Sequence, residues 1–432
     1  MAAINMQAEE LNSIIEKANP IIYDLLSEKG KAIYFPKEGI LAQSAQAKGK
    51  KINATIGAAI EDDGTPMRLS TISKYIGIDP KDAFSYAGSY GKPELRTAWK
   101  NLIYKKNPSL KANVSEPVVT CALTHGLSMI GYLFVNQGDK IILADKLWGN
   151  YRLIFENAYG ASLDTFNTFV EKHFDTEALN NKLNENFGKK IVLLNFPNNP
   201  TGYTPTNSEV KEIAEIIKKA AVKGNKIIVI CDDAYFGLVF EDGIYSESIF
   251  TLLANIHENV LAVKLDGATK EDYAWGLRVG FITYASKGLN AESYKALEDK
   301  TAGAVRGSIS NAPHLSQSLV LKSINSLEYI SEKKKKFDIL KGRYEKIKET
   351  LRDKKYEKHF SPVPFNSGYF MCIKLQEGLD SEKIRHILLS KYDTGVISIK
   401  NMLRIAFSSV AQKDMKQLFD NIYNACEDFF KK

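Results

Sequence analysis

The sequence predicts an α/β fold: a large, mostly parallel sheet flanked by helices, with a smaller α+β domain beside it. Two observations predict the sheet. Short apolar runs alternate with segments of helical period through the middle of the chain, and polar residues follow four of those runs. A third observation, one long helical pattern after about residue 312, predicts the second domain. Strands that alternate with helices pair in parallel, because each helix carries the chain back across the sheet.

Six apolar runs are expected to be strands, and they cover residues 118–121, 140–144, 191–196, 226–231, 260–265 and 279–284. Helices are expected between them. Pro93–Lys106 opens with proline, whose missing N–H costs nothing in a first turn. Another helix spans about 126–135. A third ends at Val222, with Asn207 as its cap and Gly224 after its end.

The long helical pattern contains five regularly spaced apolar residues, Phe337, Leu340, Tyr344, Ile347 and Leu351. Strand-like segments at 368–375 and 403–407 and a final helix from about Gln412 follow it. These segments divide the chain into an N-terminal arm with part of the small domain (1–65), a large domain (66–311) and a small C-terminal domain (312–432).

Composition narrows the class of protein. The chain has 432 residues, 44% hydrophobic and 25% charged, with a formal charge of +7, which is typical of a globular protein without nucleic-acid partners. Four scattered cysteines form no CxxC pair, so neither a disulfide framework nor a metal site is expected. Without a signal-like N-terminus or an apolar run of about 18 residues, no membrane association is expected and the cytoplasm is the predicted compartment.

The polar residues that follow the strands are the candidate site, because ligands of open α/β sheets bind at the carboxyl ends of the strands. One strand is followed by Asn199, in the run Asn-Pro-Thr-Gly. The next is followed by Asp232 and Tyr235, and a third by Lys270 and Arg278. A fourth leads into three residues at an expected helix start, Thr124, His125 and Gly126.

This ordered set, together with a late Arg404-Ile-Ala-Phe run, resembles the fold-type I pyridoxal-phosphate-dependent aminotransferases over about residues 50–410. Further features resemble the aspartate and aromatic aminotransferase branch: residues 52–57 followed by Asp62-Asp63-Gly64, Tyr86 ahead of Gly91-Lys92-Pro93-Glu94, Trp148-Gly149-Asn150, and Arg306 before Ser310-Asn311. The resemblance implies an aspartate aminotransferase-like large domain with a sheet of seven-stranded type, bound pyridoxal 5'-phosphate, and a homodimer with shared active sites.

The resemblance also implies a role for each catalytic residue. Lys270 would link to the cofactor aldehyde and then shuttle the substrate proton. Lys264, which lies six residues earlier in the expected strand 260–265, is the competing lysine. Asp232 would keep the pyridine nitrogen protonated, since a neighbouring opposite charge favours the charged form; its neighbour Asp233 lacks the tyrosine three residues later. Tyr235, with the amide of Asn199, would bind the phenolic oxygen of the cofactor.

The remaining cofactor contacts concern the phosphate and the ring. The helix start at Thr124, His125 and Gly126 would supply backbone N–H groups, and Arg278 a bidentate guanidinium. Trp148 would stack on the ring. Tyr86 would reach the phosphate in the neighbouring subunit.

Two positions depart from the family pattern. Gly267 stands where the family often has a serine, which leaves the phosphate one hydrogen bond short or dependent on Thr269 or water. Tyr151 stands where the branch commonly has a histidine behind the pyridine-pairing aspartate.

Substrate binding is expected from five residues, Gly57, Asn150, Asn199, Arg306 and Arg404. Arg404 would grip the α-carboxylate, and Arg306 would enter the neighbouring subunit's site toward a side-chain carboxylate. The predicted reaction is amino transfer between an L-amino acid, either aspartate or glutamate or an aromatic one, and a 2-oxo acid by a ping-pong mechanism. The alternatives are a carbon–sulfur lyase on the same fold and cofactor, and a transcription regulator, which would need a DNA-binding domain in the roughly 50 residues ahead of Ile52.

Overall fold

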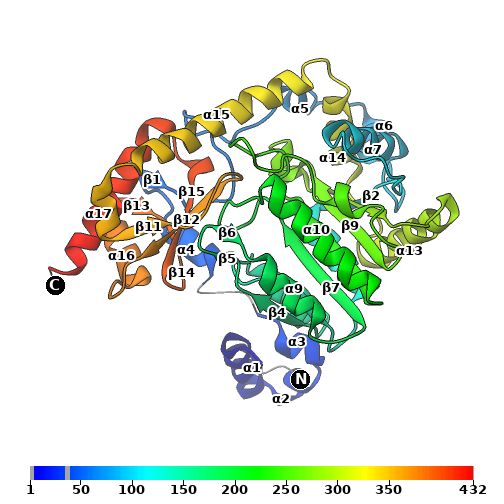
Figure 1. The fold of residues 1–432 in the computed structure, drawn as a ribbon, viewed down its shortest axis with the longest axis horizontal. Coiled ribbons are helices and arrows are strands. Elements are labelled where there is room, and N and C mark those ends of the chain that lie inside the picture. Colours follow the sequence, from blue (N-terminus) through cyan, green and yellow to red (C-terminus); the bar gives the residue numbers. More distant parts are fainter. Residues whose placement is uncertain (1–3, 35–38, 432) are drawn as a thin grey trace.

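The computed structural model describes residues 4–34 and 39–431. Its centre is a seven-stranded sheet with the order β2-β10-β9-β8-β7-β3-β4 (Figure 1). The strands are β2 (Val118–Cys121), β3 (Lys140–Ala144), β4 (Ser162–Phe166), β7 (Lys189–Asn195), β8 (Lys226–Asp232), β9 (Val260–Gly267) and β10 (Val279–Ala285). All neighbours pair in parallel except β10, which is antiparallel to both β2 and β9. The predicted fold class is confirmed.

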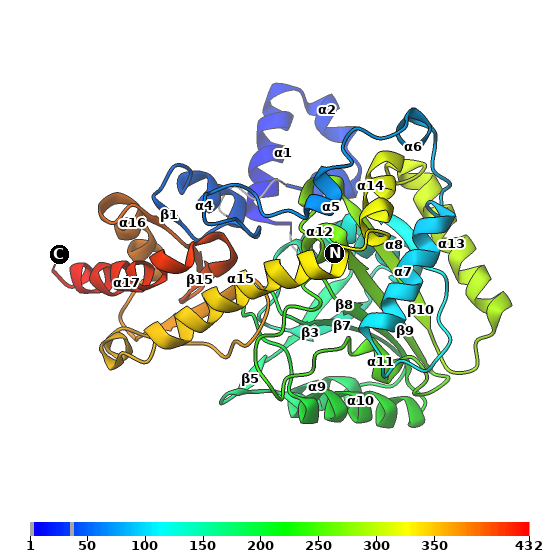
Figure 2. The same ribbon diagram turned by 90° about the horizontal axis from the view of Figure 1, so that it is seen from above.

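Helices cover both faces of this sheet (Figure 2). On one face lie α9 (Thr176–Asn184) and α10 (Asn207–Val222), and on the other α7 (Pro93–Lys106), α8 (Ala122–Phe134), α13 (Ala291–Ile309) and α14 (His314–Ile324). The buried face of α10 carries Val210, Ile213 and Ile217, as its spacing predicts. The expected cap at Asn207 is wrong. Thr206 caps the helix, since its hydroxyl accepts from the Glu209 N–H while Glu209 accepts from the Thr206 N–H.

Helix α8 begins at Ala122, four residues before the start expected near Gly126. Glycine usually marks a helix end, but Gly126 lies inside this helix for a packing reason. A Cβ at this position would lie 2.3 Å from Leu265 Cδ1 on β9, so a larger residue would require the Leu265 side chain or α8 to move. The strand β2 ends at Cys121 and α8 begins at the next residue, Ala122, where a φ of 61° turns the chain.

The C-terminal part contains an antiparallel sheet with the order β11-β12-β15-β14. Its strands are β11 (Phe360–Pro362), β12 (Phe370–Leu375), β14 (Ile397–Ile399) and β15 (Met402–Ala406), and its helices are α16 (Ser381–Lys391) and α17 (Met415–Phe429). The long helix α15 (Tyr329–Thr350) runs from the neighbourhood of α5 (Ser70–Ser73) to α17 (Figures 1 and 2).

Residues near the N-terminus pack in two places. The strand β1 (Ile52–Asn53) pairs in parallel with β13 (Thr394–Gly395), which joins this segment to the C-terminal part. Helices α1 (Met6–Ala18), α2 (Pro20–Asp24) and α3 (Glu28–Ala32) lie beside the large sheet, where Asn157 donates to the carbonyl of Ala32 at 2.7 Å. We propose domain boundaries after residues 65 and 311 on the basis of these contacts.

Within the described residues, no helix combines the length and apolar character needed to cross a membrane.

Candidate active site

Six of the predicted site residues meet where the large sheet faces the C-terminal part. Asp232 ends β8, and Asn199 follows β7. Lys270 lies in the short helix α12 (Ala268–Glu271), which follows β9 directly. The other three are Tyr235, Arg278 and Arg404, the last of them on β15. The Lys270 Nζ lies 5.1 Å from the centre of the Tyr235 ring, and Arg404 Nη1 donates to Asn199 Oδ1 at 3.3 Å.

Asp232 is buried and held by two donors. Its Oδ2 accepts from the Tyr151 hydroxyl at 2.6 Å, and its Oδ1 accepts from the backbone N–H of Ala234 at 3.1 Å. Burial raises the pKa of Asp232, while the Tyr151 bond and the charge of Lys270 act in the opposite direction. Tyr151 is itself buried. The tyrosine therefore makes the contact behind Asp232 that the family gives to histidine.

Lys270 is half-buried, and its carbonyl accepts from the Tyr369 hydroxyl at 3.1 Å. Burial lowers the pKa of Lys270 to about 8, Asp232 opposes this shift, and Arg278 adds to it. With this pKa about a tenth of the Lys270 side chains are free amine at pH 7, far more than for an ordinary lysine, and a nucleophile or proton carrier needs the free amine.

The competing residues Lys264 and Asp233 are engaged with each other. The Lys264 ammonium is fully buried, ion-paired with Asp233 and 3.4 Å from Asp266. Asp233 and Asp266 hold the pKa of Lys264 above its ordinary value in spite of burial. A lysine that is charged and enclosed in this way is a poor nucleophile, which favours Lys270 as the reactive amine.

Tyr235 lies between the two halves of the site. Its ring packs edge-on against Tyr369 and Phe370, with centroids 5.3 and 5.5 Å away. Burial raises the pKa of its hydroxyl, and the Arg404 charge partly offsets this. The phenol therefore stays protonated and available as a donor.

Arg404 is a buried guanidinium beside an aromatic ring. Its Nη2 donates to the carbonyl of Thr55 at 2.9 Å, and its Cζ lies 4.4 Å from the centre of the Phe370 ring. Its Nε has no hydrogen-bond partner among the residues that the structure describes. Gly57 adjoins the same ring, since a Cβ there would lie 3.2 Å from Phe370 Cζ.

The first turn of α8 packs on β9 and β10, and its residues are not arranged as the sequence predicts. The His125 ring is occupied: its Nδ1 accepts from the Cys121 N–H at 3.1 Å, and its Nε2 lies 3.0 Å from Ser308 Oγ. Because α8 begins at Ala122, Gly126 lies in its second turn, where its N–H belongs to the helix. The N–H groups of Ala122 to Thr124 point out of the helix start and suit an anion.

Two glycines on the strands leave room for the start of α8 to pack closely on the sheet. Gly267 pairs with Gly280 across β9 and β10. A Cβ on Gly267 would lie 2.5 Å from the Val279 carbonyl oxygen, and one on Gly280 would lie 2.6 Å from the carbonyl carbon of Ala122. A serine therefore does not fit at position 267 without a backbone shift. The buried hydroxyl of Thr269 has no hydrogen-bond partner among the described residues and is the nearest substitute.

Four other predicted residues lie at or outside the edge of this cluster. Trp148 is half-buried and packs edge-on against Tyr151, with ring centroids 5.5 Å apart. Asn150, Tyr86 and Arg306 are exposed. Tyr86 is 89% exposed, which is high for an aromatic side chain and consistent with a place at a subunit interface.

Sequence reasoning missed several residues of the site. Asn195 links Asp232 to Asn199, because its amide donates to the Asp232 carbonyl at 2.9 Å and accepts from the Asn199 N–H at 2.8 Å. A polar residue at the end of an apolar strand was the available signal. Phe370 and Tyr369 carried no such signal, since aromatic residues in a strand are usually core.

The residues present fit pyridoxal phosphate. Asp232 would offer a carboxylate to the pyridine nitrogen, Lys270 an amine to the aldehyde, and Tyr235 with Asn199 donors to the phenolic oxygen. Arg278 is half-buried, donates to the Trp275 carbonyl at 3.2 Å, and would bind the phosphate together with the start of α8. The unpaired Thr269 hydroxyl and Arg404 Nε are buried polar atoms of the kind that a bound ligand satisfies.

Comparison with known proteins agrees with this geometry. A family model described as aminotransferase class I and II matches residues 61–422. An aspartate aminotransferase of Bacillus sp. (strain YM-2) is 26% identical over 304 residues, which cover 69% of this chain and 71% of that protein. The cytoplasmic aspartate aminotransferase of Schizosaccharomyces pombe is 23% identical over 316 residues, 70% of this chain and 75% of that protein.

Solved structures share the fold. An aminotransferase from Anaerococcus prevotii superposes with a TM-score of 0.82 at 23% identity, covering 93% of this chain and 99% of that one. A kynurenine aminotransferase from Pyrococcus horikoshii, in complex with PMP, gives a TM-score of 0.78 at 15% identity and covers 95% and 99%. The family match spans most of the chain and includes every strand of the large sheet, so this chain belongs to the class I and II aminotransferases and is a pyridoxal-phosphate-dependent aminotransferase.

Proposed function

We propose that the enzyme transfers an amino group between an L-amino acid, aspartate or glutamate or an aromatic one, and a 2-oxo acid by a ping-pong mechanism. The single observation that carries the assignment of an α-amino acid and a 2-oxo acid as substrates is the buried guanidinium of Arg404. Relatives named aspartate aminotransferase and aspartate/prephenate aminotransferase support the same class.

Arg404 differs from the two other arginines that are buried within residues 4–34 and 39–431. Arg343 lies 2.9 Å from a carboxylate oxygen of Asp62, and Arg385 is ion-paired with Glu382. In the described parts of the chain, no carboxylate lies within ion-pair distance of Arg404. A buried charge without a counter-charge is costly, so this guanidinium is built to receive an anion from outside. The α-carboxylate of an amino acid or a 2-oxo acid fits it bidentately.

The chain's own residues divide the work between binding and proton transfer. When bound, pyridoxal phosphate supplies an aldehyde that links to amines and a ring that withdraws electrons from the substrate Cα. Asp232 holds the ring nitrogen in its protonated form, with Tyr151 behind it. Lys270 Nζ carries the proton to and from the substrate Cα. Arg404 fixes the carboxylate and so orients the Cα–H bond toward Lys270.

A homodimer in the cytoplasm completes the proposal. Ile76, Phe84 and Tyr86 are 69%, 88% and 89% exposed, which makes the segment around α6 (Pro80–Phe84) an apolar surface suited to a second copy. In a dimer, Tyr86 and Arg306 would reach the neighbouring subunit's site, where Arg306 would meet the side-chain carboxylate of a dicarboxylic substrate. The cytoplasmic placement rests on the composition and on the yeast relative.

The test is a panel of amino donors with 2-oxoglutarate as acceptor. Arg404→Lys should lower kcat/KM for every donor by about 100-fold, or about 2.7 kcal/mol, because lysine cannot make the bidentate contact. Arg306→Asp should lower kcat/KM for aspartate and glutamate while largely sparing an aromatic donor. If Arg306→Asp leaves the dicarboxylate rates unchanged, the dicarboxylate assignment is wrong. If Arg404→Lys is neutral, the carboxylate binds elsewhere.

A further inference from the structure

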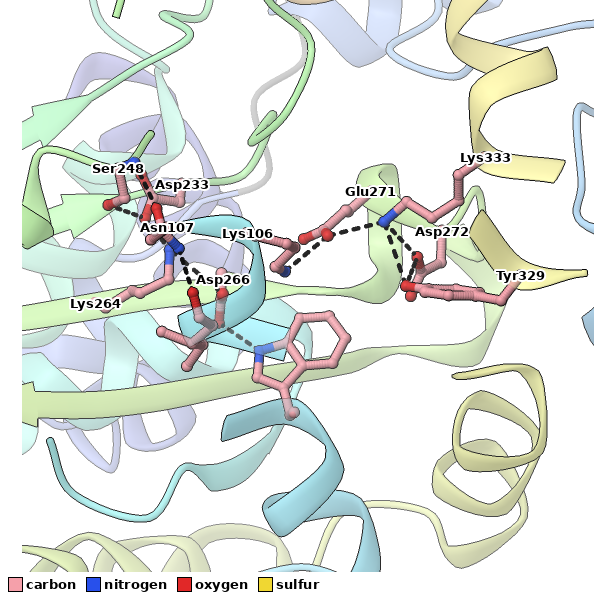
Figure 3. Close-up of polar contacts among 12 residues, drawn as sticks. Lys106, Asn107, Asp233, Ser248, Lys264, Asp266, Glu271, Asp272, Tyr329 and Lys333 are labelled. Carbon is pink, nitrogen blue, oxygen red and sulfur yellow. Dashed lines mark hydrogen bonds and ion pairs between the residues drawn. The ribbon is translucent and has the colours of Figure 1, made fainter. Parts of the chain in front are cut away.

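Charged residues next in sequence to the site residues contact one another in the interior of the large domain (Figure 3). The carboxylates are the sequence neighbours of the residues that form the site: Asp233 follows Asp232, Asp266 precedes Gly267, and Glu271 and Asp272 follow Lys270. All four carboxylates are buried, and the cations that contact them are Lys106, Lys264 and Lys333. The proposed reaction uses none of these residues.

The charged group beside Lys270 is centred on Lys333. Its Nζ lies 2.8 Å from Glu271 Oε1 and 3.0 Å from Asp272 Oδ1, so one ammonium joins both residues that follow Lys270. Two further donors complete the group: Tyr329 donates to Asp272 Oδ1 at 2.7 Å and Lys106 to Glu271 Oε1 at 2.7 Å (Figure 3). Glu271 and Asp272 are 6% and 1% exposed, so water cannot replace these contacts.

The backbone around Lys270 needs such contacts. The helix α12 is only four residues long, and two non-glycine residues after it, Tyr273 and Arg278, have φ of 55° and 54°. Left-handed backbone is unfavourable for residues with a side chain and persists where the surroundings fix it. Glu271 and Asp272 lie between Lys270 and the first of these strained residues, so their contacts are placed to fix this turn.

Lys333 also connects the turn to the other half of the site. It lies on α15, and later turns of this helix contact the C-terminal part and the segment that precedes the large domain. Lys336 is ion-paired with Glu61, and Arg343 donates to the carbonyls of Ile60 and Ser408. Ser408 lies four residues after Arg404. The same rigid helix therefore holds the chain near Lys270 at one end and the chain near Arg404 further along.

We propose that Lys333 is a positioning residue for Lys270: by binding Glu271 and Asp272 it anchors the Lys270 turn to α15 and so fixes the reactive amine relative to Arg404. This inference rests on the proposed role of Lys270 and adds a residue, outside the cofactor site, on which that role depends.

The test separates positioning from charge balance. Lys333→Met leaves two buried carboxylates with one lysine and should lower the melting temperature. Lys333→Met/Asp272→Asn removes the surplus charge, while the oxygen of the new side-chain amide still accepts from Tyr329. The decisive comparison is between this double variant and Asp272→Asn alone. Lys334→Met is the matched control, because Lys334 lies on the same helix but is exposed and pairs only with Asp338 among the described residues.

Three quantities are measured for each variant: the melting temperature, kcat and KM, and the pH midpoint at which Lys270 of the cofactor-free protein reacts with an amine reagent, read by peptide mapping. Relative to Asp272→Asn, the double variant should have a similar melting temperature, a kcat at least about tenfold lower with a smaller change in KM, and a midpoint shifted by about 0.5 pH unit or more. Lys333→Arg should recover part of the lost kcat.

Equal kcat and equal midpoints for the double variant and Asp272→Asn would overturn the proposal, and so would a double variant that cannot fold, because Lys333 would then support the fold as a whole. Borohydride reduction of the holoenzyme distinguishes a different failure. If the parent protein carries no label on Lys270, the role that the proposed function gives to Lys270 is wrong; if Lys270 is labelled and the variants behave alike, only the role of Lys333 is wrong.

Discussion

Tyr151 holds the buried carboxylate of Asp232 with a neutral hydroxyl group. The 2.6 Å bond favours the ionised carboxylate, whereas burial favours the protonated acid, and burial prevails, so the pKa of Asp232 stays above its ordinary value. A histidine in this place can carry a positive charge, and a tyrosine cannot. The charge of Asp232 therefore depends on a hydrogen bond and on the bound cofactor rather than on a second cation behind it.

Tyr151→Phe should lower kcat about tenfold, equivalent to about 1.4 kcal/mol, because a hydrogen bond to a charged group is lost. Without the donor the pKa of Asp232 rises further, so the acidic limb of the pH–rate profile should move to higher pH. The matched control is Tyr159→Phe, which removes a hydroxyl bonded to Ser128 instead. A profile that does not move for Tyr151→Phe would show that the bond leaves Asp232 unaffected.

Lys270 offers a second test at this scale. Because only the free amine reacts with an aldehyde, cofactor uptake by the cofactor-free protein should accelerate with rising pH, with a midpoint at about 8. Asp232→Asn removes a charge that raises the pKa of Lys270 and should lower the midpoint. Arg278→Gln removes a charge that lowers it and should raise the midpoint. Stopped-flow absorbance measures the pH midpoint of cofactor uptake for the parent protein and for both variants. Midpoints that shift in the same direction for both variants would contradict this electrostatic account.

At the scale of elements, the start of α8 is placed by glycines on the strands beneath it. Gly267 and Gly280 face each other across β9 and β10, and Gly126 faces β9 from the helix. Together they let three N–H groups approach the site from the sheet side. Position 267 therefore carries glycine instead of serine because the start of α8 packs closely on the sheet there.

Gly267→Ser should destabilise the protein by about 1–3 kcal/mol, because the added Cβ overpacks against the Val279 carbonyl and the Gly280 Cα. The phosphate end should loosen with it, so cofactor should dissociate faster. Urea denaturation and cofactor release measure the two effects. Gly77→Ser is the matched control, since nothing lies within 4 Å of a Cβ at that exposed position. Equal stability of the two variants would mean that α8 can move away without cost.

The local pattern of apolar and polar residues predicts most strands and several helices of the large domain. Six strands of the large sheet follow from apolar runs, and Pro93–Lys106 was predicted to the residue. The edge strand β4 was missed because its side chains are largely accessible, so Ser162–Phe166 has no continuous apolar run. The start of α8 was misplaced because Gly126 is a packing glycine. The Tyr151–Asp232 contact joins residues 81 positions apart, and no local pattern encodes such a pair.

For the whole molecule, the distribution of exposed site residues determines what one subunit can do alone. Asp232, Lys270 and Arg404 are brought together within one chain, whereas Tyr86 and Arg306 are exposed on its surface. In the proposed site, one chain would supply the reactive amine and the α-carboxylate contact, and the second chain of the dimer would supply the contact for the distal carboxylate.

Mixing Lys270→Ala with Arg306→Ala subunits should restore about a quarter of the parental activity toward aspartate, because half of the dimers are hybrids and each hybrid has one intact site. Unfolding and refolding the mixture allows subunits to exchange, and a coupled assay measures the rate. Lys270→Ala mixed with Asp232→Ala is the control, since both residues belong to the same chain's site and every hybrid site lacks one of them. Rescue in the control, or none in the test mixture, would contradict the shared site.

The pairing of β1 with β13 can form only late in synthesis on the ribosome, because β13 is made long after β1. Lys51 and Asp393, at the ends of these strands, are 342 residues apart in sequence and hydrogen-bonded in the fold. At about 5–20 residues per second, the segment around Ile52 waits about 20–70 s for its partner strand to be made. All seven strands of the large sheet are made within that interval. The large domain is therefore able to form while the C-terminal part is still incomplete, and Lys270, the proposed reactive lysine, is made well before Arg404.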